Sequence, residues 1–206
     1  MKAREKQLLL ENMKAELSAL KRSPLYRYRV ENNYLPVVGE GSVSANVMFI
    51  GEAPGRNEAK TGRPFCGSAG KILDELLDSI KMERGDVYVT NIVKDRPPKN
   101  RDPLPEEIKV YGPFLDKQIE LIQPKVIATL GRYSMKYILE KFGLHGELRP
   151  IGEMHGKFLE ADAPYGKIKI AILYHPCVAI YNRKKLPGLK KDMKIINKTC
   201  PPKFSQ

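Results

Sequence analysis

The sequence has little cysteine, and the three cysteines it has form no recognisable pattern. Cys66, Cys177 and Cys200 make no CxxC pair and no metal-finger spacing. Their odd number argues against the disulfide framework of a secreted domain. Long apolar runs are missing too, since no stretch reaches the roughly 18 apolar residues of a membrane span, and the charged N-terminus does not resemble a signal peptide. We therefore expect a cytoplasmic protein with no membrane partner.

Acidic residues are scarce relative to basic ones. The chain has 24 Asp and Glu against 36 Lys and Arg, which gives a formal net charge of +12. Its 206 residues are enough to bury a sizeable core without disulfides or metal. A solubility requirement or the charge-rich surface of a thermophile would also produce such an excess. We favour a nucleic-acid partner, because so large a positive charge repels itself unless a polyanion binds.

Short apolar runs alternate with amphipathic segments along the chain. Four runs predict buried strands, at residues 47–50, 87–90, 125–130 and 169–174. Helices are predicted over residues 3–22, from Ser68 onward, and over 105–122, 134–142 and 188–197. This alternation is typical of a parallel sheet covered on both faces. The predicted fold class is α/β, a three-layer α/β/α arrangement around a mainly parallel four-stranded sheet.

Further predictions concern the N-terminal region and the domain organisation. The first helix should bury Leu9, Met13, Leu17 and Leu20, which recur at three- and four-residue steps. The segment 23–45, rich in Pro and Gly, should be mostly loop. No linker divides the chain, so we predict one domain over residues 1–206 that closes with a short tail over 198–206.

Polar residues follow the predicted strands at their carboxyl ends. Glu52 and Glu58 follow the first strand, Asn91 the second and His175 the last. Each alone is more often structural: Asn after a strand commonly bonds its own backbone, and a lone His before Pro is seldom catalytic. The carboxyl ends of parallel strands meet at one edge of the sheet, where ligands bind. Their convergence therefore predicts a functional site at this edge.

Four segments resemble motifs of the family 4 uracil-DNA glycosylases, in the right order and spacing. The first motif corresponds to VMFIGEAPGRNEAKTGRPFCGSAGKILDELL and the second block to VYVTNIVKDRPPKNRDP. The helix and strand that come next correspond to PFLDKQIELIQPKVIATLG, and the last motif to LYHPCVAIYNRKK. The resemblance covers about residues 20–197. It implies a single uracil-DNA glycosylase-like domain and a base excision repair enzyme.

Such an enzyme flips uracil out of DNA and hydrolyses its N-glycosidic bond to leave an abasic site. The pocket then needs an aromatic face, a polar edge that distinguishes uracil from cytosine, and a donor for the charge that develops on the departing base. Phe65 is the predicted stacking face and Asn91 the reader of the base edge. His175 is predicted to donate to the uracil carbonyl beside the breaking bond. No lysine occupies a Schiff-base position, so the enzyme is predicted to be monofunctional.

A carboxylate must act near the sugar, and the first motif offers two candidates. Glu52 and Glu58 are both implicated by the resemblance, which slightly favours Glu58. Substrate contacts are also expected from the backbone of Ala53, Pro54, Gly55 and Gly67. At Gly55 a side chain would obstruct the incoming base.

DNA-binding residues are predicted on two neighbouring segments. The resemblance places an apolar tip in the minor groove, where it fills the gap left by the flipped base; the tip consists of Val178, Ile180 and Tyr181. Phosphate contacts are predicted for Arg183, Lys184, Lys185, Arg96, Lys99 and Arg101. The alternative for the apolar tip is simple core packing. The alternative for the basic residues is a solvent-exposed charged surface with no role in DNA binding. The expected partner is uracil-containing DNA, bound by a monomer.

The chain departs from the family at the four cysteines that usually hold a 4Fe–4S cluster. Leu20, Ser23, Asp95 and Tyr111 stand at these positions, and none provides the thiolate that cluster iron requires. We therefore expect no cluster, no other metal site and no cofactor. Packing by Leu20, Tyr111 and the N-terminal helix should replace the cluster, while Cys200 should lie in a frayed tail.

Two other functions fit the same sequence. The first is a glycosylase for another deaminated base, such as hypoxanthine or xanthine, which the sequence separates poorly from a uracil enzyme. The second is a non-catalytic nucleic-acid binder on the same fold. The carboxylates and His175 favour an enzyme, because a binding protein needs neither.

Overall fold

The computed structural model describes residues 1–200, whose strands form one six-stranded sheet in the order β1-β3-β2-β4-β6-β5. The strands are β1 (Glu40–Gly41), β2 (Val47–Gly51), β3 (Tyr88–Asn91), β4 (Val126–Leu130), β5 (Lys157–Ala163) and β6 (Gly166–Leu173). The central strands β3, β2, β4 and β6 are parallel, whereas β1 and β5 pair antiparallel at the edges. The α/β class with a mainly parallel sheet is confirmed, and the four predicted strands are the parallel ones.

The predicted total of four strands was too low. Strand β1 has only two residues, which is too short for any periodic pattern. Strand β5 is a largely exposed edge strand in which Ala161 is the only fully buried residue. Neither strand carries the continuous apolar run that marks a strand buried on both faces, so only pairing with the rest of the sheet reveals them.

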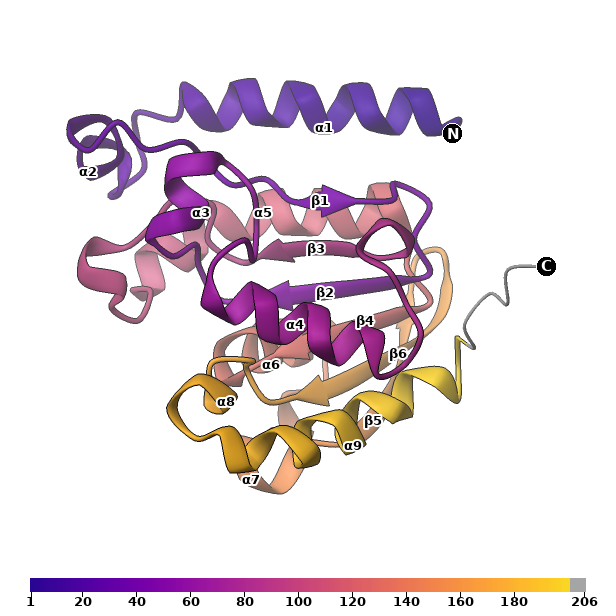
Figure 1. The fold of residues 1–206 in the computed structure, drawn as a ribbon. Helices are drawn as coiled ribbons and strands as arrows, with labels where there is room; N and C mark the ends of the chain where they lie inside the picture. Colours follow the sequence, from indigo (N-terminus) through magenta and orange to yellow (C-terminus); the bar gives the residue numbers. More distant parts are fainter. Residues whose placement is uncertain (201–206) are drawn as a thin grey trace.

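Helices cover both faces of this sheet (Figure 1). They are α1 (Ala3–Ser18), α2 (Tyr26–Glu31), α3 (Arg56–Thr61), α4 (Ser68–Asp78), α5 (Pro105–Ile122), α6 (Arg132–Lys141), α7 (Ile151–Met154), α8 (Val178–Tyr181) and α9 (Leu186–Asn197). Side chains of β2 alternate between the layers, with Val47 and Phe49 facing α4 and α9, and Met48 and Ile50 facing α1, α5 and α6. The two apolar cores on opposite faces give the three-layer arrangement.

The N-terminal predictions need two corrections. Helix α1 ends at Ser18 and buries Leu10 rather than Leu9, whose side chain is exposed. Residues 23–45 are mostly loop, as expected, apart from the short helix α2 and the two-residue strand β1. At the other end Cys200 is buried in the core beside α9 rather than frayed, and the rest of the predicted tail lies outside the described residues. No helix within residues 1–200 is long and apolar enough to cross a membrane.

The strand order determines where a site can form. The chain passes from β2 to β3 on one side and then returns to β4 on the other side of β2. Such a reversal opens a crevice at the carboxyl ends of the strands. The polar residues that follow β2, β3, β4 and β6 therefore meet at one edge.

Candidate active site

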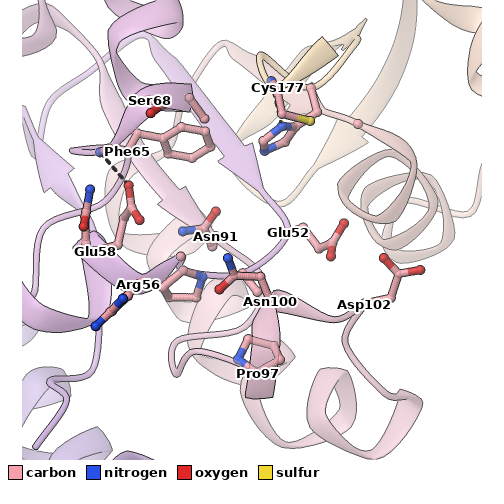
Figure 2. A pocket seen from close by; sticks show the side chains of 18 of the residues that line it. Glu52, Arg56, Glu58, Phe65, Ser68, Asn91, Pro97, Asn100, Asp102 and Cys177 are labelled. Carbon is pink, nitrogen blue, oxygen red and sulfur yellow. Dashed lines mark hydrogen bonds between the residues drawn. The ribbon is translucent and has the colours of Figure 1, made fainter. Parts of the chain in front are cut away.

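A cavity of about 610 Å³ opens at this carboxyl edge (Figure 2). It is lined by residues 52–58, 65, 67–69, 91, 97, 100–102, 131, 132, 175, 177 and 181. All of the residues predicted to act on the base or to contact it line this cavity. Of the predicted DNA-binding residues, only Arg101 and Tyr181 do so.

Phe65 forms one wall of the pocket in a strained backbone conformation. Its φ is 48°, which bulky residues rarely adopt. The Arg84 guanidinium donates to the Phe65 carbonyl and also to Asp74, at 2.7 Å. The Phe65 ring lies 5.8 Å from the His175 ring, centroid to centroid. These contacts hold an aromatic face beside the histidine, as a stacking role requires.

Asn91 is the last residue of β3, and its side chain points into the pocket (Figure 2). It is buried, and within residues 1–200 its Oδ1 has no hydrogen-bond partner. Gly51 makes room for it, since a Cβ at that glycine would lie 2.3 Å from Asn91 Oδ1 and 2.6 Å from the Phe65 ring. A buried acceptor without a partner is costly unless a ligand provides the donor.

His175 is held in one tautomer. Its Nδ1 lies 3.1 Å from the Cys177 backbone N–H, which donates to it. The proton of the neutral ring must therefore sit on Nε2. Burial lowers the pKa of His175 to about 4, although the nearby Glu58 opposes this change. At neutral pH the ring is an uncharged donor through Nε2.

The two candidate carboxylates have different surroundings. Glu58, on α3, is buried, and its Oε1 accepts from the Gly67 backbone N–H at 2.8 Å. A Cβ at Gly55 would lie 2.7 Å from the other oxygen, Oε2. Gly55 therefore makes room for this carboxylate, whereas the sequence argument linked it to the incoming base. The hydrogen bond between Gly67 and Glu58 thus connects the loop after Phe65 to α3.

The side-chain carboxylate of Glu52 accepts no hydrogen bond within the described range, and it lies on the opposite side of the pocket from Glu58 (Figure 2). Burial, and to a lesser extent the negative charge of Asp102, raise the pKa of Glu52 to about 7, although the nearby Arg132 opposes this change. Asp102 accepts from Arg132 at 2.5 Å and from the Tyr133 hydroxyl at 2.8 Å. A carboxylate with a pKa near neutrality is suited to general acid–base catalysis.

Sequence reasoning missed Asp102 as a member of the pocket, and it placed Arg132 at this edge of the sheet without giving it a role. Arg132 comes two residues after the third predicted strand, which indicates its place in the pocket, because that strand's carboxyl end lies at the same edge. Asp102 lies in a long loop between β3 and α5, and no local pattern distinguishes it from other loop carboxylates. Only the fold brings it beside Glu52.

The predicted apolar tip forms α8 at the rim of the pocket. Tyr181 is 88% exposed and Ile180 46% exposed, whereas Val178 is half-buried against the core under α4. The alternative of core packing therefore describes Val178 better than the other two. Ile180 and Tyr181 form an exposed apolar pair beside the pocket, and such exposed apolar surface often marks a binding site. Their position fits side chains that insert between the bases of DNA.

The predicted phosphate contacts divide into two groups. Lys99, Lys184 and Lys185 are exposed and form no ion pair within residues 1–200. The other three already have protein partners: Arg183 with Glu75, Arg101 with Glu107, and Arg96 with two tyrosine hydroxyls and an amide. The unpaired lysines are the better candidates for phosphate.

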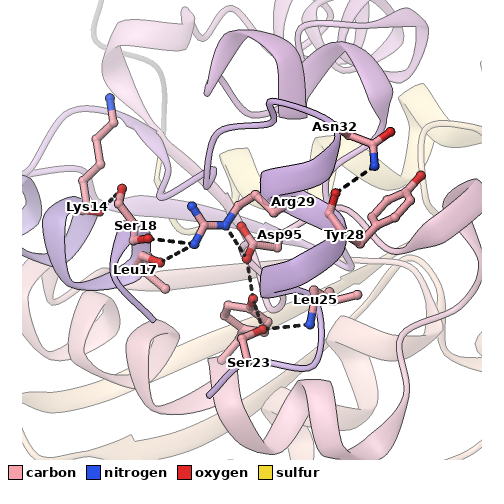
Figure 3. Close-up of polar contacts among 10 residues, drawn as sticks. Lys14, Leu17, Ser18, Ser23, Leu25, Tyr28, Arg29, Asn32 and Asp95 are labelled. Atoms are coloured by element: carbon pink, nitrogen blue, oxygen red, sulfur yellow. Dashed lines mark hydrogen bonds and ion pairs between the residues drawn. The ribbon is translucent and has the colours of Figure 1, made fainter. Parts of the chain in front are cut away.

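The positions of the family's cluster cysteines meet in the fold, but they form a polar network (Figure 3). Tyr111 donates to Asp95 at 2.6 Å and accepts from the Ser23 hydroxyl at 2.5 Å. Arg29 pairs with the same Asp95 oxygen at 3.0 Å and donates to the last carbonyls of α1. Leu20 packs in the adjoining core. The side-chain oxygens of Ser23, Asp95 and Tyr111 are already hydrogen-bonded within this network, and cluster iron requires thiolate ligands. These residues therefore do not fit an iron–sulfur cluster.

The cysteines provide no substitute site. Cys66 follows Phe65, Cys177 lies at the start of α8, and Cys200 is buried beyond α9. The part of the chain that the structure describes contains no group of three or more His, Cys, Asp or Glu residues that could hold a metal ion.

The chain is therefore an α/β protein whose polar pocket lies at the carboxyl ends of an open, mainly parallel sheet, where proteins of this class bind their ligands. The family model of the uracil DNA glycosylase superfamily matches residues 38–198. The chain belongs to this superfamily. It is 39% identical over 191 residues, 93% of each chain, to the type-4 uracil-DNA glycosylase of Archaeoglobus fulgidus. It is 44% identical to the type-4 enzyme of Sulfurisphaera tokodaii, over 91% of this chain and 83% of the relative.

A more distant relative is the type-5 uracil-DNA glycosylase of Thermus thermophilus. It is 36% identical over 130 residues, which is 56% of this chain and 59% of the relative. The type-4 relatives match far more of the chain.

Proposed function

We propose that this chain is a monofunctional uracil-DNA glycosylase that acts in base excision repair. The observation that carries the proposal is the buried, unpartnered Oδ1 of Asn91. Uracil offers an N3–H donor beside a carbonyl acceptor, and a side-chain amide complements both. Cytosine has no proton on N3 and carries an amino group in place of the carbonyl. The same amide orientation therefore rejects cytosine, whose binding would leave buried groups unpaired.

His175 would stabilise the departing base. When the bond between C1′ of the sugar and N1 of uracil breaks, its electron pair passes to the base, and negative charge develops on the carbonyl beside N1. A neutral Nε2–H group is suited to this oxygen, because a donor already in position stabilises the negative charge as it develops. The Phe65 wall would hold the base in place by stacking.

Glu52 is our candidate for activating water. A water molecule would attack C1′ as its proton passes to the Glu52 carboxylate, and the sugar keeps the new hydroxyl. Two features support this role: the pKa of Glu52 lies near 7, and within the described residues no group donates a hydrogen bond to its carboxylate. The hydrogen bond from Gly67 to Glu58 supports a structural role for Glu58, against the preference that the family resemblance suggested.

The rest of the DNA would be bound around the pocket. Ile180 and Tyr181 would fill the gap left by the flipped base, and Lys99, Lys184 and Lys185 would contact phosphates. We propose that the protein works as a monomer built of one domain, because a single sheet runs through the residues that the structure describes. Free thiols are compatible with a reducing compartment such as the cytoplasm.

We also propose that the enzyme works without an iron–sulfur cluster, because the network around Asp95 takes the place of the cluster ligands. Protein purified anaerobically should be colourless and contain no stoichiometric iron. A brown protein with about four irons per chain, the content of one [4Fe–4S] cluster, would contradict this proposal.

Excision of uracil in EDTA tests the main proposal. Purified protein is incubated with DNA that contains one uracil, either opposite guanine or in a single strand, and alkali then reveals abasic sites. Cleavage only after alkali is expected. Activity on hypoxanthine or xanthine but not uracil would favour the alternative substrate class. Binding of DNA without excision of any of these bases would favour a non-catalytic binder.

A further inference from the structure

Lys94 is fully buried, and the chemistry proposed above does not use it. Its side chain lies in the core below the end of β3, three residues after Asn91. Within residues 1–200 its Nζ contacts no carboxylate. A buried ammonium without a counter-ion is costly, and burial lowers the pKa of Lys94 accordingly. A methionine would fill similar space at lower cost, so the amine calls for a specific explanation.

One of the hydrogen bonds of Lys94 reaches the backbone of Asn91. Nζ donates to the Asn91 carbonyl at 2.6 Å, to Gln118 Oε1 at 2.6 Å and to Thr90 Oγ1 at 2.8 Å. Three N–H groups thus meet three acceptors, which is the complete donor set of an ammonium. A longer contact of 3.4 Å reaches the Val38 carbonyl.

These acceptors are themselves fixed. Thr90 Oγ1 donates to the Val38 carbonyl at 2.6 Å, and Gln118 Nε2 donates to the same carbonyl at 2.9 Å. The backbone N–H of Val37 donates to the Lys94 carbonyl at 2.8 Å. The ammonium is therefore held by β3, α5 and the segment before β1 together, so it cannot move independently of the sheet.

Such a support matters for Asn91, because within residues 1–200 no hydrogen bond holds its side-chain oxygen. The orientation of that amide depends on its packing against Gly51 and on the direction of its own backbone. Strand β3 ends at Asn91, and a backbone hydrogen bond to β2 restrains one side of the peptide that follows. The Ile92 N–H donates to the Gly51 carbonyl at 3.1 Å. Lys94 restrains the other side of the same peptide through its carbonyl.

The geometry points to Lys94 as a positioning residue that sets the direction of the Asn91 amide and thereby the recognition of the base. This inference rests on the proposed function of the pocket. Lys94 touches no substrate and acts only through the Asn91 peptide. A displacement of about 1 Å at a reacting or binding group can cost about 100-fold in rate.

The test compares Lys94→Met with Leu139→Ala, a buried change in α6 that lowers stability without touching this network. Three quantities are measured at a temperature where both variants are folded. They are the single-turnover rate on uracil-containing DNA, the inhibition constant of free uracil, and the affinity for DNA with an abasic-site analogue.

For Lys94→Met we expect a rate lowered about 100-fold and weaker inhibition by uracil, with unchanged affinity for the abasic analogue. Leu139→Ala should match the wild type in all three. Gln118→Met, which removes one acceptor of the ammonium, should show a smaller loss of the same two quantities, and it decides the matter if Lys94→Met does not fold.

The positioning role would be overturned if Lys94→Met, or Gln118→Met where Lys94→Met does not fold, kept the wild-type excision rate and the wild-type inhibition by uracil. An equal loss in Leu139→Ala would also overturn it, since the effect would then follow stability alone. An inactive wild type would instead overturn the proposed function, and this inference with it.

Discussion

Replacing Glu52 by glutamine should stabilise the folded chain at alkaline pH and remove most of its catalysis. Burial and the neighbouring Asp102 raise the pKa of Glu52 from 4.5 to about 7. A carboxyl group whose pKa is raised by folding binds its proton more tightly in the folded state. Its ionisation therefore opposes folding, and this cost appears as the pH rises through the window from 4.5 to about 7.

The expected size follows from the pKa values. Each tenfold change in a proton-binding constant is worth about 1.4 kcal/mol, so the ionised Glu52 destabilises the fold by about 3 kcal/mol above pH 7. Glutamine has nearly the same shape and no charge. The variant should match the wild type in unfolding free energy near pH 4.5 and exceed it by up to this amount at pH 8.5.

Urea unfolding at a series of pH values measures this difference, because the titration of the other groups cancels between the two proteins. Single-turnover excision at pH 8 should fall about 10²- to 10⁴-fold in the variant, as is typical for loss of a general base. A wild-type rate would remove Glu52 from the chemistry. A stability difference that does not change with pH would refute the electrostatic reasoning.

Other changes test the remaining parts of the site. Asn91→Ala should lose excision and inhibition by free uracil, while His175→Ala should slow single-turnover excision about 10²- to 10³-fold with DNA affinity kept; unchanged rates in both would place these residues outside the site. Asp102→Asn should move the neutral limb of the pH profile of kcat/KM to lower pH, because it removes a negative charge beside Glu52; an unmoved limb would assign it to another group. Lys185→Gln should lower the slope of log affinity against log salt by about 0.9 on duplex DNA, and an intact slope would argue against a phosphate contact.

Local patterns predicted the central part of the fold. The four parallel strands carry continuous apolar runs because both of their faces are buried, and the helices between them show the expected periodicity. Strand β5 and helix α2 lack such signals, since they pack at the edges where one face remains polar. The prediction that α1 buries Leu9, where the structure buries Leu10, failed for a similar reason. Local sequence does not distinguish two neighbouring leucines, and the contact of α1 with α5 determines which one is buried.

The sequence alone determined which chemical groups the site contains. Glu52, Glu58, Asn91 and His175 follow predicted strands, and the parallel topology that those strands imply brings their carboxyl ends together. What each group can do was decided by the tertiary structure. Both glutamates lie in one motif six positions apart, yet one is engaged by a backbone N–H and the other lies free beside Asp102. A carboxylate's pKa and free lone pairs depend on atoms that are distant in the chain, which local sequence does not specify.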